Sequence, residues 1–192
     1  MGNIYLNAYS TKVQIYPSIN IWCNAVHGDE RGYFVETFRQ DLFEDAIGYQ
    51  VNFIQDNESK STKGVLRGLH YQLPPYTQAK LVRVIKGSVL DVAVDVRKSS
   101  PTFGQHVAVK LTAQNKHQLF VPHGFAHGFV VLSDKATFAY KVDNYYAPDH
   151  DRGIAFDDKD LEIDWQLPPD LLQLSGKDKI HPTLANAEGL FE

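Results

Sequence analysis

The residues best suited to chemistry lie in the segment from Gly64 to Lys80, which sets three basic side chains among glycines and apolar residues. Gly64 and Gly68 flank Arg67, and glycines let a ligand approach the backbone closely. His70 follows shortly after. The protonated form of an imidazole is disfavoured beside other cations, so we expect His70 to stay neutral and to act as a base near pH 7.

A second histidine segment, Pro122–Phe129, carries His127 between small and aromatic residues. On its own it is equally consistent with a turn around a buried histidine. We expect the two histidine segments to face each other across a barrel and to share one pocket. Tyr140 and Tyr146 have an even separation, so a regular strand would place both on one face. A tyrosine there most often packs in the core, but its phenol can also donate a proton or stack on a ring.

The same segments argue against a metal site. Jelly-roll proteins called cupins often bind a metal through His-x-His, a later Glu and a distant His. Here Gln72 replaces the second histidine, and Lys80 stands near the position of the acidic ligand. A cation in that place repels a metal ion. We therefore expect no metal to be bound by His70 and His127.

The bulk composition indicates an ordinary globular protein. The chain has 192 residues, a length that favours one domain, residues 1–192. A net charge of −4 argues against nucleic acid as a partner, which usually requires a basic face. The single cysteine, Cys23, excludes an intramolecular disulfide and indicates a reduced, cytoplasmic protein. No apolar run is long enough to span a membrane, and the first residues do not form a signal peptide.

Alternating apolar residues and frequent turns predict an all-β fold, an antiparallel sandwich or barrel. Strands are expected over residues 33–38, 51–55, 81–85, 89–96, 106–111, 119–122, 128–132 and 136–146. Residues 1–20 could add an N-terminal strand. A short helix is expected over residues 41–47, with Gly48 ending it, and a helical turn near residues 170–174. Residues 157–192 are expected to wrap over the barrel. Polar clusters at residues 29–32, 55–57 and 177–178 have the character of solvent-exposed turns.

Taken together, these segments resemble the dTDP-4-dehydrorhamnose 3,5-epimerase family, metal-free cupins of deoxysugar biosynthesis. No single motif is decisive, but the ordered set is highly specific. The first twenty residues match poorly, and Asp151 stands where the family more often has Glu. The matching motifs are Asp29–Glu36, Gln55–Ser59, Leu66–Gln72, Gln78–Val82, Asp91–Asp95, Ser100–Gly104, Pro122–Phe129 and Tyr140–Lys141.

The resemblance implies a cupin-type jelly roll with a few short peripheral helices, no cofactor and no metal. It implies a homodimer whose members often share an N-terminal segment, here residues 1–25. The implied substrate is a dTDP-linked 4-keto-6-deoxyhexose, within dTDP-rhamnose and O-antigen synthesis. The expected reaction converts dTDP-4-dehydro-6-deoxy-D-glucose to dTDP-4-dehydro-L-rhamnose by inversion at C3 and C5.

The resemblance also implies roles for individual residues. His70 would be the base, held by Asp178; Lys80 would stabilise the enolate oxygen; and Tyr140 would be the acid on the opposite face. The assignment of Asp178 rests on the short segment Leu174–Asp178. The residues implied to line the substrate site are Arg31, Glu36, Gln55, Asn57, Arg67, His127, Asp151 and Lys177, with Tyr146 stacking on the thymine.

Elementary chemistry agrees with these roles. C3 and C5 both adjoin the C4 ketone, so loss of either proton gives an enolate on the same oxygen. One cation there can serve both epimerisations, and such a donor is worth about 3–4 kcal/mol. Inversion needs a base on one face and an acid on the other. An enzyme that inverts only one carbon would use the same base, acid and lysine, so this alternative stays open. A metal cupin lacks its ligands here, and a non-catalytic sugar-binding module would not need the base, acid and lysine together.

Overall fold

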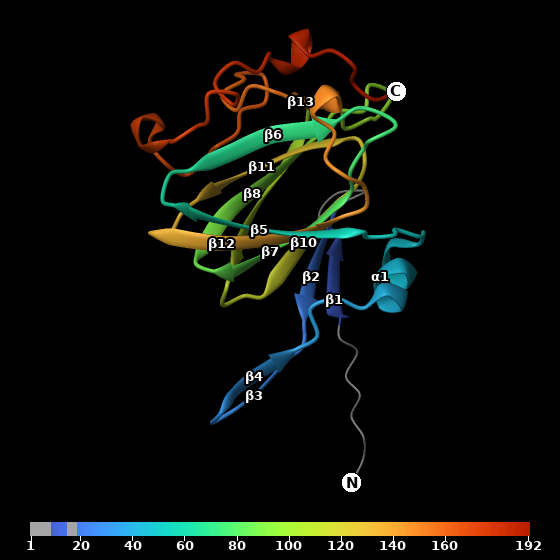
Figure 1. The fold of residues 1–192 in the computed structure, drawn as a ribbon, viewed down its shortest axis with the longest axis vertical. Helices are drawn as coiled ribbons and strands as arrows, with labels where there is room; N and C mark the ends of the chain where they lie inside the picture. Colours follow the sequence, from blue (N-terminus) through green and yellow to red (C-terminus); the bar gives the residue numbers. More distant parts are fainter. Residues whose placement is uncertain (1–8, 15–18) are drawn as a thin grey trace.

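Two antiparallel sheets form the body of the protein in the computed structural model, which describes residues 9–14 and 19–192 (Figure 1). The six-stranded sheet has the order β1 (Tyr9–Gln14), β2 (Asn20–Asn24), β10 (His117–Val121), β7 (Lys80–Lys86), β12 (Lys135–Val142) and β5 (Gln55–Thr62). The five-stranded sheet has the order β13 (Asp151–Gly153), β6 (Leu66–Gln72), β11 (Phe125–Val131), β8 (Ser88–Asp95) and β9 (His106–Thr112). The predicted all-β, antiparallel architecture is confirmed.

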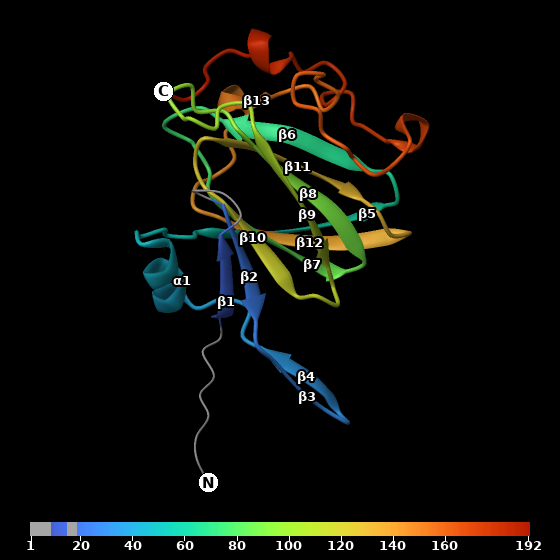
Figure 2. The same cartoon turned by 180° about the vertical axis from the view of Figure 1, so that it is seen from behind.

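A separate hairpin made of β3 (Val26–Asp29) and β4 (Gly32–Val35) projects away from both sheets (Figures 1 and 2). Two of its large apolar side chains, Tyr33 and Phe34, are 62% and 69% exposed. Lys116 anchors the hairpin through a hydrogen bond of 2.9 Å to the Tyr33 hydroxyl. The hairpin therefore presents apolar surface that the described part of this single chain does not cover.

The interior between the sheets is filled by apolar side chains at alternate strand positions, as a period of two requires. Val82 of β7, Leu119 of β10 and Phe138 of β12 contribute from the six-stranded sheet. Ala93 of β8 and Phe129 of β11 meet them from the five-stranded sheet. This packing fixes the distance between the sheets and hence the width of the space that remains for a ligand.

Strand β8 is buried on both faces, which explains its near-continuous apolar sequence. Leu90, Val92 and Val94 pack in one cluster with Trp165 of the C-terminal segment. That segment lies along the outer side of the five-stranded sheet (Figure 1). Asp91 lies on the opposite, inner face and is fully buried. Because the C-terminal segment covers the outer face of β8, the strand is buried on both sides and places the Asp91 carboxylate in the interior.

The predicted helix and its glycine end are present. Helix α1 (Gln40–Ile47) ends at Gly48, whose φ of 85° is the left-handed conformation that glycine adopts readily. Phe43 on its buried side contacts Trp22 and Phe120, with ring centroids 5.5 and 5.0 Å away. The described residues also include three short 3₁₀ helices, η1 (Pro148–His150), η2 (Pro169–Leu171) and η3 (Leu184–Asn186). No described helix is long and apolar enough to cross a membrane.

Several predicted boundaries are wrong. Residues 51–54 form no strand; the strand is β5, which runs through the polar cluster at 55–57 that was expected to be a turn. Among the described strands β5 pairs with β12 alone, and its alternate residues are exposed, so one of its faces can be polar. The strand predicted over 136–146 ends at Val142, so Tyr146 is not on it. β4 ends at Val35 rather than at residue 38. The N-terminal strand falls partly on residues 1–8 and 15–18, which lie outside the described residues.

Candidate active site

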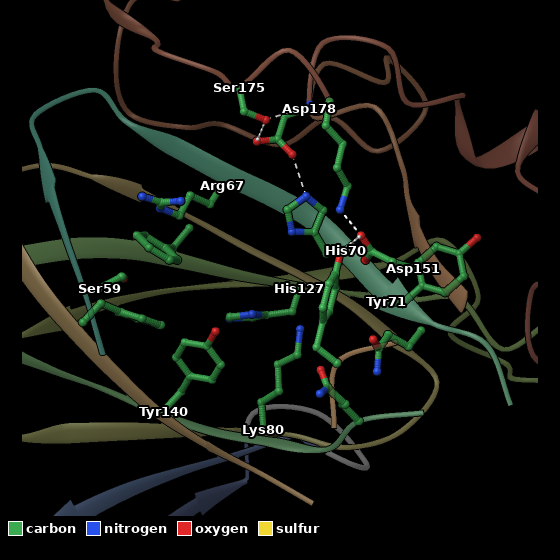
Figure 3. Close-up of a pocket in the computed structure, with 16 residues that line it drawn as sticks. Ser59, Arg67, His70, Tyr71, Lys80, His127, Tyr140, Asp151, Ser175 and Asp178 are labelled. Carbon is green, nitrogen blue, oxygen red and sulfur yellow. Dashed lines mark hydrogen bonds and ion pairs between the residues drawn. The ribbon is translucent and has the colours of Figure 1, made fainter. Parts of the chain in front are cut away.

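A pocket of about 300 Å³ opens between the two sheets and gathers most of the predicted site residues (Figure 3). The five-stranded sheet supplies one wall, the six-stranded sheet the other, and the C-terminal segment closes one side. The pocket is lined by Ser59, Arg67, His70, Tyr71, Gln72, Gln78, Lys80, His127, Phe129, Phe138, Tyr140, Tyr146, Asp151, Ser175, Lys177 and Asp178.

His70 and Asp178 form a dyad at the wall of this pocket. Nε2 of His70 lies 2.5 Å from Oδ1 of Asp178, and the Ser175 hydroxyl donates to the other carboxylate oxygen at 2.9 Å. The Asp178 side chain is only 4% exposed. Because the carboxylate accepts the proton on Nε2, the lone pair is on Nδ1, which Figure 3 shows on the pocket side of the ring.

The protonation states of the dyad suit a base. Burial lowers the pKa of His70 below its usual value, and the charges of Lys80 and Lys177 act in the same direction, against the opposing effect of Asp178. Burial alone would raise the pKa of Asp178. The hydrogen bonds from His70 and Ser175 outweigh that effect, so the pKa of Asp178 is lowered. At neutral pH the pair is therefore a neutral imidazole beside a carboxylate.

Lys80 lies on the floor of the pocket, at the start of β7. Burial lowers its pKa to about 8, and the charge of Asp91 partly opposes this. Asp91 itself accepts a hydrogen bond of 2.9 Å from Nε2 of His127. Burial raises the pKa of Asp91, while the charges of His127 and Lys80 counteract the rise. The lysine is thus a partly desolvated cation with a buried carboxylate behind it.

Tyr140 faces the dyad from the other sheet (Figure 3). Burial raises the pKa of its phenol, so the hydroxyl keeps its proton at neutral pH. Arg67 lies on β6, in the same sheet as His70, and its guanidinium donates to the Ser61 hydroxyl at 3.3 Å. The pocket therefore holds a neutral base and a protonated phenol on facing walls.

Three predicted residues contact one another at the outer rim of the pocket. The Tyr146 hydroxyl donates to Asp151 at 3.1 Å, and Lys177 forms an ion pair with the same carboxylate. The Tyr146 side chain is 59% exposed, which leaves its ring available for stacking. Asp151 begins β13, whose pairing with β6 places it opposite Gln72.

Gln72 and Asp91 are two residues whose contribution sequence reasoning missed. Gln72 donates to the carbonyl oxygens of Tyr76 and Tyr145, and its own oxygen accepts from the Ala147 amide. It therefore positions the loop that carries Tyr146. Because the Gln72 amide is saturated by backbone groups and Lys80 is a cation, these residues do not fit the metal position of a cupin. The available signal was the near-continuous apolar sequence around Asp91, which indicates a strand buried on both faces.

Four predicted residues lie outside this pocket. Arg31 is at the tip of the β3–β4 hairpin, 84% exposed and paired with Asp29. Glu36 follows β4 and is half-buried. Gln55 and Asn57 lie on the face of β5 that also carries Ser59, and the Gln55 amide donates to Asn57 at 2.7 Å. The structure brings none of the four to the dyad within one chain.

The relation between the two histidine segments differs from the prediction. β6 and β11 do not face each other across the interior but are neighbours in one sheet, with His70 and His127 as direct partners in register. The facing wall is instead supplied by β7 and β12, which carry Lys80 and Tyr140. His70 and His127 nevertheless line one pocket, as predicted, because both lie on the inner face of the sheet (Figure 3).

Comparisons with known proteins agree on one family. A family model described as dTDP-4-dehydrorhamnose 3,5-epimerase matches residues 16–186. An enzyme of that name from Shigella flexneri is 56% identical over 167 residues, covering 87% of this chain and 91% of the relative. The Legionella pneumophila enzyme, solved with dTDP-4-keto-L-rhamnose, superposes with a TM-score of 0.89 at 47% identity, covering 93% and 94% of the chains. A 3'-monoepimerase from Streptomyces bikiniensis, solved with dTDP-quinovose, gives 0.83 at 37% identity, covering 89% and 86%.

Proposed function

The chain belongs to the dTDP-4-dehydrorhamnose 3,5-epimerase family, and we propose that it inverts C3 and C5 of dTDP-4-dehydro-6-deoxy-D-glucose to give dTDP-4-dehydro-L-rhamnose. The observation that carries the residue roles is one pocket with His70 on one wall and a half-buried Lys80 and Tyr140 on the facing wall. Relatives solved with dTDP-sugars support a nucleotide sugar as the ligand.

His70 removes the substrate proton in this proposal. Nδ1 accepts the proton from C3 or C5, and the bonding electrons move into an enolate whose charge lies on the C4 oxygen. The imidazolium that forms is stabilised by Asp178, which already accepts from Nε2. The carboxylate thus holds one tautomer and one ring orientation, and it does not need to take up the proton itself.

Lys80 stabilises the enolate oxygen. The ammonium lies in a pocket that excludes much of the water, where a fixed charge acts more strongly than in bulk solvent. One such donor contributes about 3–4 kcal/mol to transition-state stabilisation. Because both enolates share the C4 oxygen, the same lysine serves the two inversions.

Tyr140 returns a proton to the opposite face. Its hydroxyl keeps its proton at neutral pH and comes from the sheet facing the base. Proton delivery from the facing wall inverts the carbon, whereas return from His70 would restore the original configuration. Arg67, His127, Tyr146, Asp151 and Lys177 bind the rest of the nucleotide sugar, the cations suiting its diphosphate.

The active form in this proposal is a homodimer. The hairpin carries exposed Tyr33 and Phe34 together with Arg31, and in one chain it projects into solvent. Self-association would cover these apolar rings and would carry Arg31 and Glu36 to the pocket of the second copy. The cytoplasmic location inferred from the lone Cys23 stays a prediction.

Solvent exchange tests the proposed reaction. In deuterated water, the purified protein should incorporate deuterium at both C3 and C5 of dTDP-4-keto-6-deoxyglucose and yield the L-configured product. His70→Ala should abolish incorporation while leaving the circular dichroism spectrum unchanged. Label at one carbon would indicate the single-carbon reaction of the similar 3'-monoepimerase. Absence of label at both carbons would refute either epimerase activity.

A further inference from the structure

His181 lies behind the dyad, in a position that the proposed reaction does not use. Its Nε2 is 3.6 Å from Oδ1 of Asp178, the same oxygen that lies 2.5 Å from Nε2 of His70. The two imidazole rings meet edge to face with centroids 5.5 Å apart. One ligand atom from each of the three residues lies within 4.8 Å of the other two.

The His181 ring is buried and confined. Its Nε2 makes no hydrogen bond within the described part of the chain and has almost no solvent contact. Gly153 packs directly against it, since a Cβ at that position would lie 2.5 Å from the ring. Gly153 also pairs with His70 through β13 and β6. A buried polar atom without a hydrogen bond is unfavourable, so a ligand that engages Nε2 would stabilise the site.

We propose that His70, Asp178 and His181 form an inhibitory site for a divalent transition metal, with Zn²⁺ as the best match. Two imidazoles and one carboxylate, with a fourth position left for water, are a ligand set typical of zinc. This inference rests on the proposed role of His70 as the base. The site lies on the side of the imidazole that faces Asp178, and so differs from a cupin metal position.

Zinc coordination requires modest changes in all three ligand separations, and the separation of His70 and His181, which is within 4.8 Å, must close by at most about 1.5 Å. Zinc bonds of about 2.0–2.2 Å in a tetrahedron place ligand atoms roughly 3.3–3.5 Å apart. The separation of 3.6 Å between His181 and Asp178 is already close to that value. The pair of His70 and Asp178 must open by less than about 1 Å, replacing its hydrogen bond with two metal bonds. Asp178 is in a turn and His181 follows that turn, outside the sheets.

Metal binding at this site changes which nitrogen of His70 carries the proton. In the active dyad Nε2–H donates to Asp178, and the lone pair on Nδ1 faces the substrate. A metal bound by Nε2 uses the lone pair of that nitrogen, so the proton moves to Nδ1 and none is released. The protonated Nδ1 cannot accept a proton from C3 or C5. Since the metal lies behind the ring, kcat should fall while KM changes little.

Nearby positive charges weaken metal binding at this site, so we expect the metal to act as a reversible inhibitor and not as a permanent ligand. Lys80 and Lys177 both act on His70, and a divalent cation would be repelled by them. Lys177 is partly neutralised by its ion pair with Asp151, and Lys80 by the charge of buried Asp91. We therefore expect reversible binding that a chelator undoes.

The test compares the full-length protein with two single variants after chelator treatment. Zn²⁺ is titrated into the deuterium-incorporation assay, and Co²⁺ is titrated separately to read the visible absorption of a tetrahedral site. The wild-type protein should lose kcat with Zn²⁺, regain it with chelator, and show the Co²⁺ bands. His181→Ala removes one of the three ligands and should weaken both effects by at least the roughly 10- to 100-fold that follows loss of an outer-shell partner. His123→Ala, which removes the exposed pair of His123 with Asp143, is the matched control and should behave as wild type.

Equal metal sensitivity of His181→Ala and wild type would overturn the proposal. So would an absence of tetrahedral Co²⁺ bands in the wild-type protein, whether or not it is active. Co²⁺ bands without Zn²⁺ inhibition would overturn the inhibitory role. Failure of the proposed epimerase function is recognised separately, because the chelator-treated protein would then incorporate no deuterium.

Discussion

Asp178 lies 2.5 Å from His70 although the two residues are 108 positions apart in the chain. His70 is fixed by β6 and Asp178 by the turn that the Ser175 hydroxyl stabilises. The carboxylate is buried and ionised, so it determines which imidazole nitrogen carries the proton. The C-terminal segment therefore supplies a part of the proposed active site, in addition to covering the outer face of β8.

Asp178→Asn should show how much of the proposed catalysis depends on the Asp178 carboxylate, which holds His70 in the tautomer with its proton on Nε2. An amide can orient the ring through either tautomer but cannot stabilise the imidazolium. We expect kcat to fall by roughly 10²- to 10⁴-fold with little change in KM. Ser175→Ala removes only the hydrogen bond to the second carboxylate oxygen and should cost far less. Similar losses in the two variants would point to disruption of the turn instead.

The pH dependence of kcat/KM should be bell-shaped. Burial lowers the pKa of His70 below its usual value, so the base becomes protonated and inactive only at a lower pH than a free imidazole would. Lys80 has a pKa of about 8 and loses its charge as the pH rises through that value. Activity should therefore be highest between these limits, measured with chelator present. Any residual activity of Lys80→Arg should lack the falling limb, because a guanidinium stays charged.

Local patterns predicted the fold class, whereas most of the pocket was predicted from the resemblance of the ordered motifs to a known family. Alternation along β8 and the helix ending at Gly48 follow from residue type. The side-by-side pairing of His70 and His127 could not be predicted, because register depends on contacts between distant strands. The polar strand β5 was missed for a related reason, since an edge strand needs few apolar residues.

Tyr140→Phe should separate proton removal from inversion. The variant keeps His70 and Lys80, so enolate formation should continue and His70 should return solvent deuterium to the original face. Formation of the inverted product should fall by roughly 10²- to 10⁴-fold, and exchange should fall less. Nuclear magnetic resonance of recovered substrate measures both. Tyr146→Phe is the matched control, because its hydroxyl binds Asp151 at the rim. Equal loss of exchange and inversion in Tyr140→Phe would remove Tyr140 from the role of acid.

Mixing two inactive variants should test the proposed homodimer. Arg31 is on the exposed hairpin, and His70 is in the pocket. If Arg31 acts in the second copy, a heterodimer of Arg31→Ala and His70→Ala subunits contains one complete site. Random exchange at equal concentration should then restore about a quarter of the wild-type sites, given a two-fold dimer. No recovery after verified subunit exchange would show that Arg31 does not act across subunits.

Asp91→Asn should shift the alkaline limb of the kcat/KM profile, where activity falls, to lower pH. The charge of Asp91 raises the pKa of Lys80 against the stronger effect of burial. Removing that charge should lower the pKa of Lys80 further below 8, so that activity declines at a lower pH than in wild type. The amide oxygen can still accept the hydrogen bond from His127, which limits structural disturbance. Asp56→Asn, which alters an exposed ion pair with Lys141, should leave the limb in place. An unchanged limb in Asp91→Asn would mean that Asp91 does not set the charge state of Lys80.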